Sequence, residues 1–172
     1  DKTNRSIESS GNNVHESSAT VTARSGSKML KTWGQYDGGN DNETPHYYEA
    51  AADPGASYNF SIYAFTHPDD AIRDGGKAYI KIKFFDSNWA ELPGAASDTV
   101  DSNADSTWRY LSAQAVAPAN AAMVQAAIIY FQKGWSGGSV YWDDAYFTTN
   151  SFTQIGVVTS KTLWAGSGGD IR

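Results

Sequence analysis

Two adjacent aspartates, Asp143 and Asp144, interrupt an aromatic segment at residues 140–147 and are the side chains best placed to do chemistry. Apolar residues alternate along this segment up to Trp142, as the buried face of a β-strand requires. Beyond the aspartates the alternation resumes at Ala145, one residue out of phase. A phase slip of this kind predicts a β-bulge at the two carboxylates.

The aspartate pair would lie beside the core, where an uncompensated carboxylate is costly. A paired cation or a bound metal ion removes most of that cost, and calcium prefers oxygen ligands of this kind. The two aspartates are therefore candidates for pairing with a cation or binding a metal ion. The alternative is an ordinary exposed aspartate pair at a strand end, and the two residues alone leave both interpretations open.

A second set of polar side chains comes from residues 78–85, where every second residue is apolar. Side chains on a strand alternate between its two faces. The predicted inward set is Ile80, Ile82 and Phe84. The predicted outward set, aromatic at both ends with two ammonium groups between, is Tyr79, Lys81, Lys83 and Phe85.

Two other segments alternate in the same way. In residues 58–65 the predicted inward side chains are Tyr58, Phe60 and Ile62, and the outward ones are Ser61, Tyr63 and Phe65. In residues 122–132 the predicted inward side chains are Val124, Ala126 and Ile128, which leaves Gln125 outward beside Ala127 and Ile129.

The composition favours an all-β extracellular domain. Of 172 residues, 13% are aromatic and only 19% are charged, so the polar surface must come largely from uncharged side chains. The net charge of −6 argues against nucleic-acid and anionic-membrane partners. There is no cysteine, which excludes disulfides and thiolate zinc sites. The chain opens on Asp1 rather than methionine, from which we expect a processed or excised fragment.

Short apolar segments separated by turn residues predict about nine strands and no convincing helix. We expect strands at residues 19–23, 29–33, 47–52, 58–65, 78–85, 122–132 and 140–147, and loops at residues 34–45, 66–76 and 92–107. Many short strands without helices predict an all-β fold, a two-sheet antiparallel β-sandwich of the jelly-roll type.

The order of five short segments resembles the β-sandwich carbohydrate-binding modules, in the group that includes families 4, 9, 16 and 22. The segments are Ile7-Glu8, residues 25–30, residues 53–61 with their Pro-Gly turn, residues 108–121, and residues 140–147. The resemblance covers residues 5–148 and implies a jelly-roll sandwich that binds a polysaccharide. The stretch after Glu8 is short and lacks the tryptophan often found there, which predicts a reduced N-terminal loop.

The resemblance also implies a structural calcium ion that ties the N-terminal segment to the last strand. Its implied ligands are the carboxylates of Glu8 and Asp143 and backbone carbonyls near Ser6, Ser25 and Lys28. A mixture of carboxylate and carbonyl oxygens is the usual ligand set of calcium.

Outward aromatic side chains beside amides and amines suit sugar recognition, because a pyranose ring stacks on an aromatic face while polar groups bind its hydroxyls. The candidate ligand-binding residues are Trp33, Tyr36, Tyr63, Tyr79, Lys81, Lys83, Trp89, Gln125 and Trp135. Each loop aromatic could equally complete the core. The two lysines indicate an anionic polysaccharide if they line a groove, whereas the net charge argues for a neutral β-glycan, so the polymer class stays open.

None of the 19 carboxylates lies in a catalytic motif, and no nucleophile or phosphate-binding motif is present. We therefore expect no catalytic residues. The predicted protein is a carbohydrate-binding sandwich over residues 1–148, followed by an extra strand or a linker over residues 149–172. It would be a monomeric, secreted bacterial module that targets a covalently linked glycoside hydrolase or polysaccharide lyase. The alternatives are a cell-surface or viral adhesive sandwich, and then a small polysaccharide lyase or glycosidase.

Overall fold

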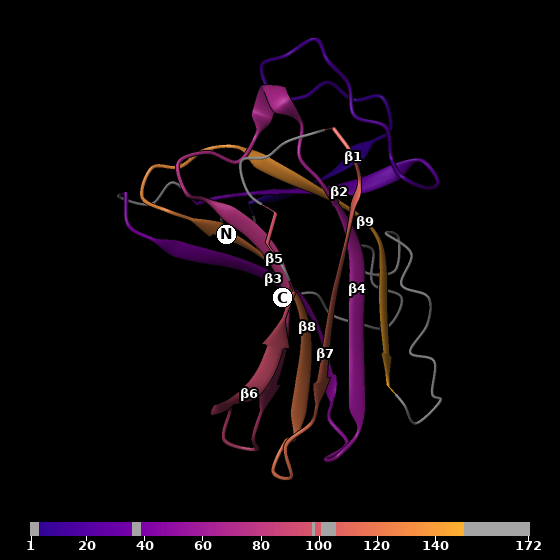
Figure 1. Cartoon of the computed structure of the whole chain (residues 1–172), viewed down its shortest axis with the longest axis vertical. Coiled ribbons are helices and arrows are strands. Elements are labelled where there is room, and N and C mark those ends of the chain that lie inside the picture. Colours follow the sequence, from indigo (N-terminus) through magenta and orange to yellow (C-terminus); the bar gives the residue numbers. More distant parts are fainter. Residues whose placement is uncertain (1–3, 36–38, 98, 101–105, 150–172) are drawn as a thin grey trace.

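The chain folds into two antiparallel β-sheets packed face to face (Figure 1). This computed structural model describes residues 4–35, 39–97, 99–100 and 106–149. Five strands form one sheet in the order β1-β2-β9-β4-β7, and four form the other in the order β3-β8-β5-β6. The predicted fold class, a two-sheet antiparallel β-sandwich, is confirmed.

The strands of the five-stranded sheet are β1 (Arg5–Ser9), β2 (Lys28–Trp33), β9 (Ser139–Thr149), β4 (Ser57–Phe65) and β7 (Arg109–Val116). The strands of the four-stranded sheet are β3 (Asn42–Ala51), β8 (Met123–Gln132), β5 (Lys77–Phe85) and β6 (Glu91–Ala96). A single turn of 3₁₀ helix covers Pro68–Asp70. Among the described residues, none belongs to a helix that could cross a membrane.

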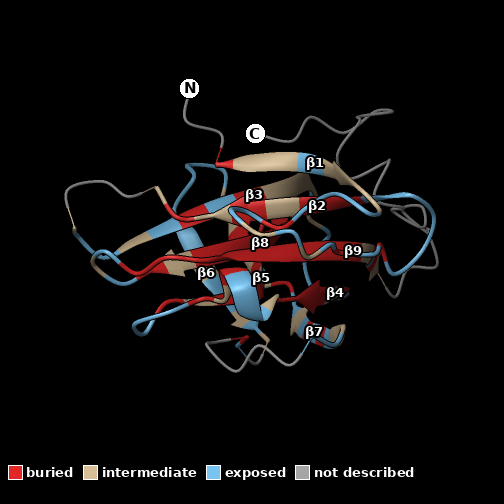
Figure 2. Ribbon diagram, turned by 90° about the horizontal axis from the view of Figure 1, so that it is seen from above, coloured by how far each residue is buried: buried red, intermediate tan, exposed pale blue. Residues whose placement is uncertain are grey.

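The main core lies between the two sheets and follows the predicted alternation. Ile80, Ile82 and Phe84 of β5 are completely buried, and Tyr58 and Phe60 of β4 are nearly so. Figure 2 shows buried residues running along β8 and β9, the central strands of their sheets. Burial of each large apolar side chain contributes about 2 kcal/mol, so alternation alone fixes which face of each strand points inward.

The predicted bulge in β9 is present. Between Ser61 and Tyr63 of β4 the register with β9 shifts, so that two residues of β9 oppose one of β4. Asp144, one of those two, has a φ of 52°, in the left-handed region that aspartate tolerates better than most residues. The extra residue lets Trp142 and Phe147 both reach the core although they lie an odd number of positions apart.

A smaller apolar cluster covers part of the outer face of the five-stranded sheet. Residues 10–27 cross that face and form one isolated bridge, between Asn13 and Thr20. The buried members of the cluster are Val14, Val21, Ala23, Met29, Phe65 and Tyr141. This part of the outer face is therefore a second core, and Phe65 is covered although it points away from the main one.

Three element predictions were wrong. Residues 19–23 form no strand and alternate only because Val21 and Ala23 pack onto the sheet. Strand β3 begins at Asn42, inside the expected loop, because an edge strand accommodates Pro45. Strand β6 begins one residue before the loop expected at residues 92–107 and otherwise lies within it, and its sequence, ELPGAA, carries no alternating pattern that could have predicted it.

Candidate functional site

The outer face of the four-stranded sheet gathers four of the predicted ligand-binding residues on one surface. In the register of β5 with β8, Lys83 lies opposite Gln125 and Lys81 opposite Ala127. Tyr79 lies two residues before Lys81 on the same face of β5. The alternation predicted that Tyr79, Lys81, Lys83 and Gln125 face outward, and the strand pairing brings them side by side.

Glu91 of β6 forms ion pairs with both lysines. Its carboxylate oxygens lie 2.9 Å from the Nζ of Lys81 and 3.6 Å from the Nζ of Lys83. The hydrogen bond from Lys81, assisted by the charge of Lys83, lowers the pKa of Glu91 in spite of its partial burial. The two ammonium groups are thus paired, and they face the surface as oriented donors rather than as a free positive patch.

Two glutamates of β3 hold the other polar groups of this face. The Tyr79 hydroxyl donates to Glu43, and the Gln125 Nε2 donates to Glu49 at 2.8 Å. Burial, together with the contact to Glu43, raises the pKa of Tyr79. Glu43 was missed because the sequence pattern placed the start of β3 too late. Glu49 was missed because no face was assigned to the side chains of that strand.

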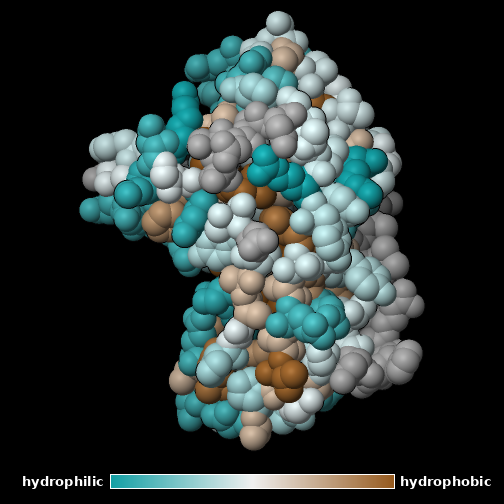
Figure 3. Space-filling model, viewed as in Figure 1, coloured by the Kyte–Doolittle hydropathy of each residue, from teal (hydrophilic) through white to brown (hydrophobic). Residues whose placement is uncertain are grey.

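The floor of this face is apolar and closed. Ala127 and Ile129 point away from the main core yet are completely buried, with Tyr47 of β3 and Tyr79 of β5 as their cross-strand neighbours. Figure 3 shows the surface hollowed on this side of the molecule, in the region between β3 and β6 of Figure 1. A shallow depression with an apolar base, flanked by longer side chains, has a shape on which a flat sugar ring can lie.

Two exposed tryptophans stand at the turns that lead out of β5 and β8. Trp89 is 56% exposed and its ring lies 5.8 Å from that of Phe85 on the outer face of β5. Trp135, in the β8–β9 turn, is 68% exposed and lies against Gly39, where a Cβ would meet the indole ring at 2.4 Å. Exposure of an indole to this degree leaves its face free for a ligand.

Two other predicted residues do not join this surface. Trp33, at the end of β2, and Tyr63, on β4, belong to the other sheet. The Arg24 guanidinium lies 3.5 Å from the centroid of the Tyr63 ring, and Tyr110 packs beside it. Tyr36 lies outside the described residues.

Asp143 has the surroundings of a possible metal ligand. Its side chain is 1% exposed, and its oxygens accept the backbone N–H groups of Ser25 at 3.1 Å and Asp144 at 2.8 Å. Burial raises its pKa, although these hydrogen bonds oppose the shift. In the described part of the chain no Lys, Arg or His forms an ion pair with Asp143, since Arg24 pairs with Asp144 instead. A cation would fit this uncompensated carboxylate.

Glu8, the second predicted carboxylate ligand, already has hydrogen-bond partners and lies on a strand that does not neighbour that of Asp143. The Glu8 carboxylate accepts hydrogen bonds from Ser6 and from Asn12, at 2.7 Å, and these outweigh partial burial so that its pKa is lowered. Strand β2 lies between Glu8 on β1 and Asp143 on β9.

The predicted ligands near Ser25 and Lys28 are backbone carbonyls, and the side chains of these two residues form hydrogen bonds of their own. Ser25 Oγ bonds to Asp144, and the Lys28 Nζ to Ser9. In the part of the chain that the structure describes, no three acidic or histidine side chains cluster closely enough to hold a metal. A calcium ion would therefore need backbone carbonyls around Asp143.

Comparison with protein-family models finds no match, and comparison with curated proteins finds none either. The fold is similar to solved structures of xylanase 10B from Clostridium thermocellum. One contains its CBM22-1 and GH10 modules complexed with xylohexaose and matches with a TM-score of 0.50 and 14% identity, over 85% of this chain and 25% of that one. The chain thus spans about a quarter of that protein's length.

The second is the C-terminal family 22 carbohydrate-binding module of the same xylanase. It matches with a TM-score of 0.50 and 18% identity, over 84% of this chain and 80% of the module. At these identities the likeness concerns the fold. The resemblance that the sequence motifs indicated, to β-sandwich carbohydrate-binding modules, is confirmed at that level.

Proposed function

We propose that this chain is a non-catalytic carbohydrate-binding module that binds a polysaccharide on the outer face of its four-stranded sheet. The observation that carries the proposal is the row of Tyr79, Lys81 and Lys83 beside Gln125 on a closed apolar floor. Trp89, at the end of this row, offers an exposed aromatic face on which a sugar ring can stack.

The polar groups of this face are suited to hydroxyls. The ammonium groups of Lys81 and Lys83 keep spare protons while paired with Glu91, and the carboxylates of Glu43 and Glu49 keep spare lone pairs. Donors and acceptors that are already oriented lose little side-chain entropy when a sugar replaces water.

Charge balance favours a neutral polymer over an anionic one. The three lysines on the outer face of β5, at positions 77, 81 and 83, are matched by three glutamates, at positions 43, 49 and 91. A uronate or sulfate would have to displace Glu91 from the lysines, whereas a hydroxyl would not. The xylohexaose in the similar structure supports a neutral β-glycan such as xylan as the first candidate.

The proposal extends to a wider role for the module. A module of this kind would hold a covalently linked polysaccharide-degrading enzyme near its substrate outside the cell and would raise its effective concentration there. We also propose that a structural calcium ion binds at Asp143, where it would supply the positive charge that this buried carboxylate lacks.

Affinity electrophoresis tests the proposal. The chain is run through gels that contain xylan, mixed-linkage β-glucan, mannan, alginate or carrageenan. We expect retardation by a neutral β-glycan, with no shortening of the polymer in solution. Lys83→Ala and Trp89→Ala should each abolish most of the retardation, and Tyr110→Ala, which removes an exposed tyrosine from β7 of the other sheet, should not. A folded chain that no polymer retards would overturn the proposal.

A further inference from the structure

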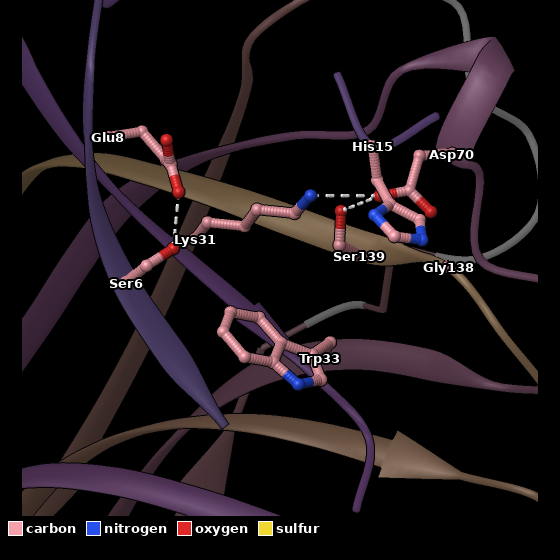
Figure 4. A pocket seen from close by; sticks show the side chains of 8 residues that line it. All are labelled: Ser6, Glu8, His15, Lys31, Trp33, Asp70, Gly138 and Ser139. Carbon is pink, nitrogen blue, oxygen red and sulfur yellow. Dashed lines mark hydrogen bonds and ion pairs between the residues drawn. The ribbon is translucent and has the colours of Figure 1, made fainter. Parts of the chain in front are cut away.

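A pocket of about 420 Å³ opens on the side of the sandwich opposite the proposed polysaccharide face. Its wall comes from β1, β2 and β9 of the five-stranded sheet and from the segments around residues 15 and 70. Figure 4 shows the eight lining residues, which are Ser6, Glu8, His15, Lys31, Trp33, Asp70, Gly138 and Ser139. The volume is at the lower end of the range of small-molecule sites, ~300–1,000 Å³.

An ion pair that is largely removed from solvent forms one end of this pocket. The Nζ of Lys31 lies 3.1 Å from the Asp70 carboxylate, and the two side chains are only 12% and 10% exposed. The same Asp70 oxygen accepts a hydrogen bond of 2.6 Å from Ser139. A pair this far from water is costly to bury and is fixed in place by its neighbours, so it presents oriented donors and acceptors to whatever fills the pocket.

The opposite end carries a second carboxylate, and an indole lies along the side. Glu8 bonds to Ser6, and in Figure 4 the Lys31 side chain extends across the pocket from the side of Glu8 toward Asp70. The ring of Trp33 lies alongside them in the same view. A flat apolar surface flanked by carboxylate, amine and hydroxyl groups matches a small ligand with both an apolar C–H face and several hydroxyls.

We propose that this pocket is a second saccharide site, which binds a neutral monosaccharide or disaccharide with its ring against Trp33 and its hydroxyls bound to Glu8, Lys31 and Asp70. Two carboxylates face one ammonium group here, so an anionic sugar would meet a net negative wall, whereas a neutral one would not. The site is separate from the polysaccharide face because a full sandwich lies between the two.

The pocket also accounts for the position of Trp33, which lies on a strand of the five-stranded sheet, whereas the other tryptophans that were candidates for sugar stacking lie in the turns that follow β5 and β8. It is the tryptophan of this site, whereas Trp89 belongs to the β5–β6 turn on the other sheet. A module with sites on both faces could bind a long chain on one and a short sugar on the other, which would bring two parts of a polysaccharide together through one domain.

Isotope-labelled protein tests the site directly, through the indole N–H resonances of the six tryptophans. Xylose, glucose, galactose, mannose and cellobiose are titrated to concentrations about tenfold above a ~1 mM Kd. We expect a saturable shift of the Trp33 resonance, assigned by its loss in Trp33→Phe, with at least one of these sugars. The resonance of Trp142 serves as an internal control, because its indole is buried and bonded to Thr32.

Two variants separate this site from the polysaccharide face. Tyr79→Ala should leave the Trp33 shift unchanged, and Trp33→Ala should abolish sugar binding measured by calorimetry while polysaccharide retardation persists. For this comparison the Trp33→Ala protein must melt cooperatively, which shows that it is folded. The shift of the Trp33 resonance in the unmodified protein is a test that does not require this variant to fold. Absence of any Trp33 shift, or shifts confined to Trp89, would overturn the second site without affecting the proposal for the four-stranded sheet.

Discussion

His46 of β3 is a buried side chain whose ionisation state affects stability. It is 6% exposed, its Nε2 has no hydrogen-bond partner among the described residues, and its Nδ1 lies 3.5 Å from Arg5 Nη1. Burial, with the charge of Arg5, lowers the pKa of His46 to about 4. The folded protein therefore holds this imidazole neutral at neutral pH.

Acidification should destabilise the protein through His46. Because the folded pKa lies below the ordinary value of about 6.5, the unfolded chain binds the proton first. The stabilising contribution is complete above that ordinary value and is lost as the pH falls toward the folded pKa. We expect a loss of about 2 kcal/mol between about pH 7.5 and about pH 5, measured by urea unfolding. His46→Gln should flatten this pH dependence, and the exposed His15→Gln should not. Equal slopes in all three proteins would contradict the assignment.

The calcium proposal makes its own prediction at Asp143. If calcium binds this buried carboxylate, a concentration about 100-fold above its Kd should add about 2.7 kcal/mol and raise the Tm by about 5–10 °C. Asp143→Asn should abolish the rise, because an amide cannot neutralise the ion. Asp74→Asn is the matched control, since Asp74 is exposed and asparagine tolerates its φ of 55°. If calcium leaves the Tm of the unmodified chain unchanged, the proposal that calcium binds at Asp143 is wrong.

At the scale of strands, one buried hydrogen bond links β2 to β9. The Trp142 indole donates to Thr32 Oγ1 at 2.8 Å, and both residues are at most 1% exposed. Thr32→Val keeps the shape of the side chain but leaves the indole N–H without its acceptor, which should cost about 1–3 kcal/mol in urea unfolding. In a Trp142→Phe background the same change should cost much less. An equal cost in both backgrounds would show that the hydrogen bond contributes nothing.

The interior strands were predictable from the sequence by their alternation, and of the edge strands only part of β3 was. The alternation at residues 78–85 and 140–147 set the faces of β5 and β9, and the phase slip located the bulge at Asp144. Strand β6 was missed because an edge strand of small residues buries little and so leaves no pattern. Alternation of apolar residues can reveal a strand only where one face of that strand is buried.

In the candidate sites of the whole molecule, the features set by local periodicity were also predictable, and those set by long-range pairing were not. Which side chains of β5 face outward follows from a period of two, so the row of Tyr79, Lys81 and Lys83 could be predicted. That Glu91 pairs with the two lysines depends on how β6 pairs with β5. That Lys31 meets Asp70 depends on a contact across 39 positions. Such pairings are set by topology, and single-sequence periodicity carries no information on them.

The charge of the whole molecule determines how its binding should respond to salt. With a net charge of −6 and its outer-face lysines matched by glutamates, the protein has little to gain from an anionic polymer by long-range attraction. Binding through hydrogen bonds and stacking involves no exchange of counterions, so screening should leave it nearly unchanged. We expect the affinity for the retarding β-glycan to change less than about twofold between about 20 mM and about 500 mM NaCl, measured by calorimetry. Alginate and carrageenan should bind weakly throughout. A tenfold loss of affinity over that range would mean that the lysines act as free charges, and Glu91→Gln, which would release them, should then strengthen binding to the anionic polymers.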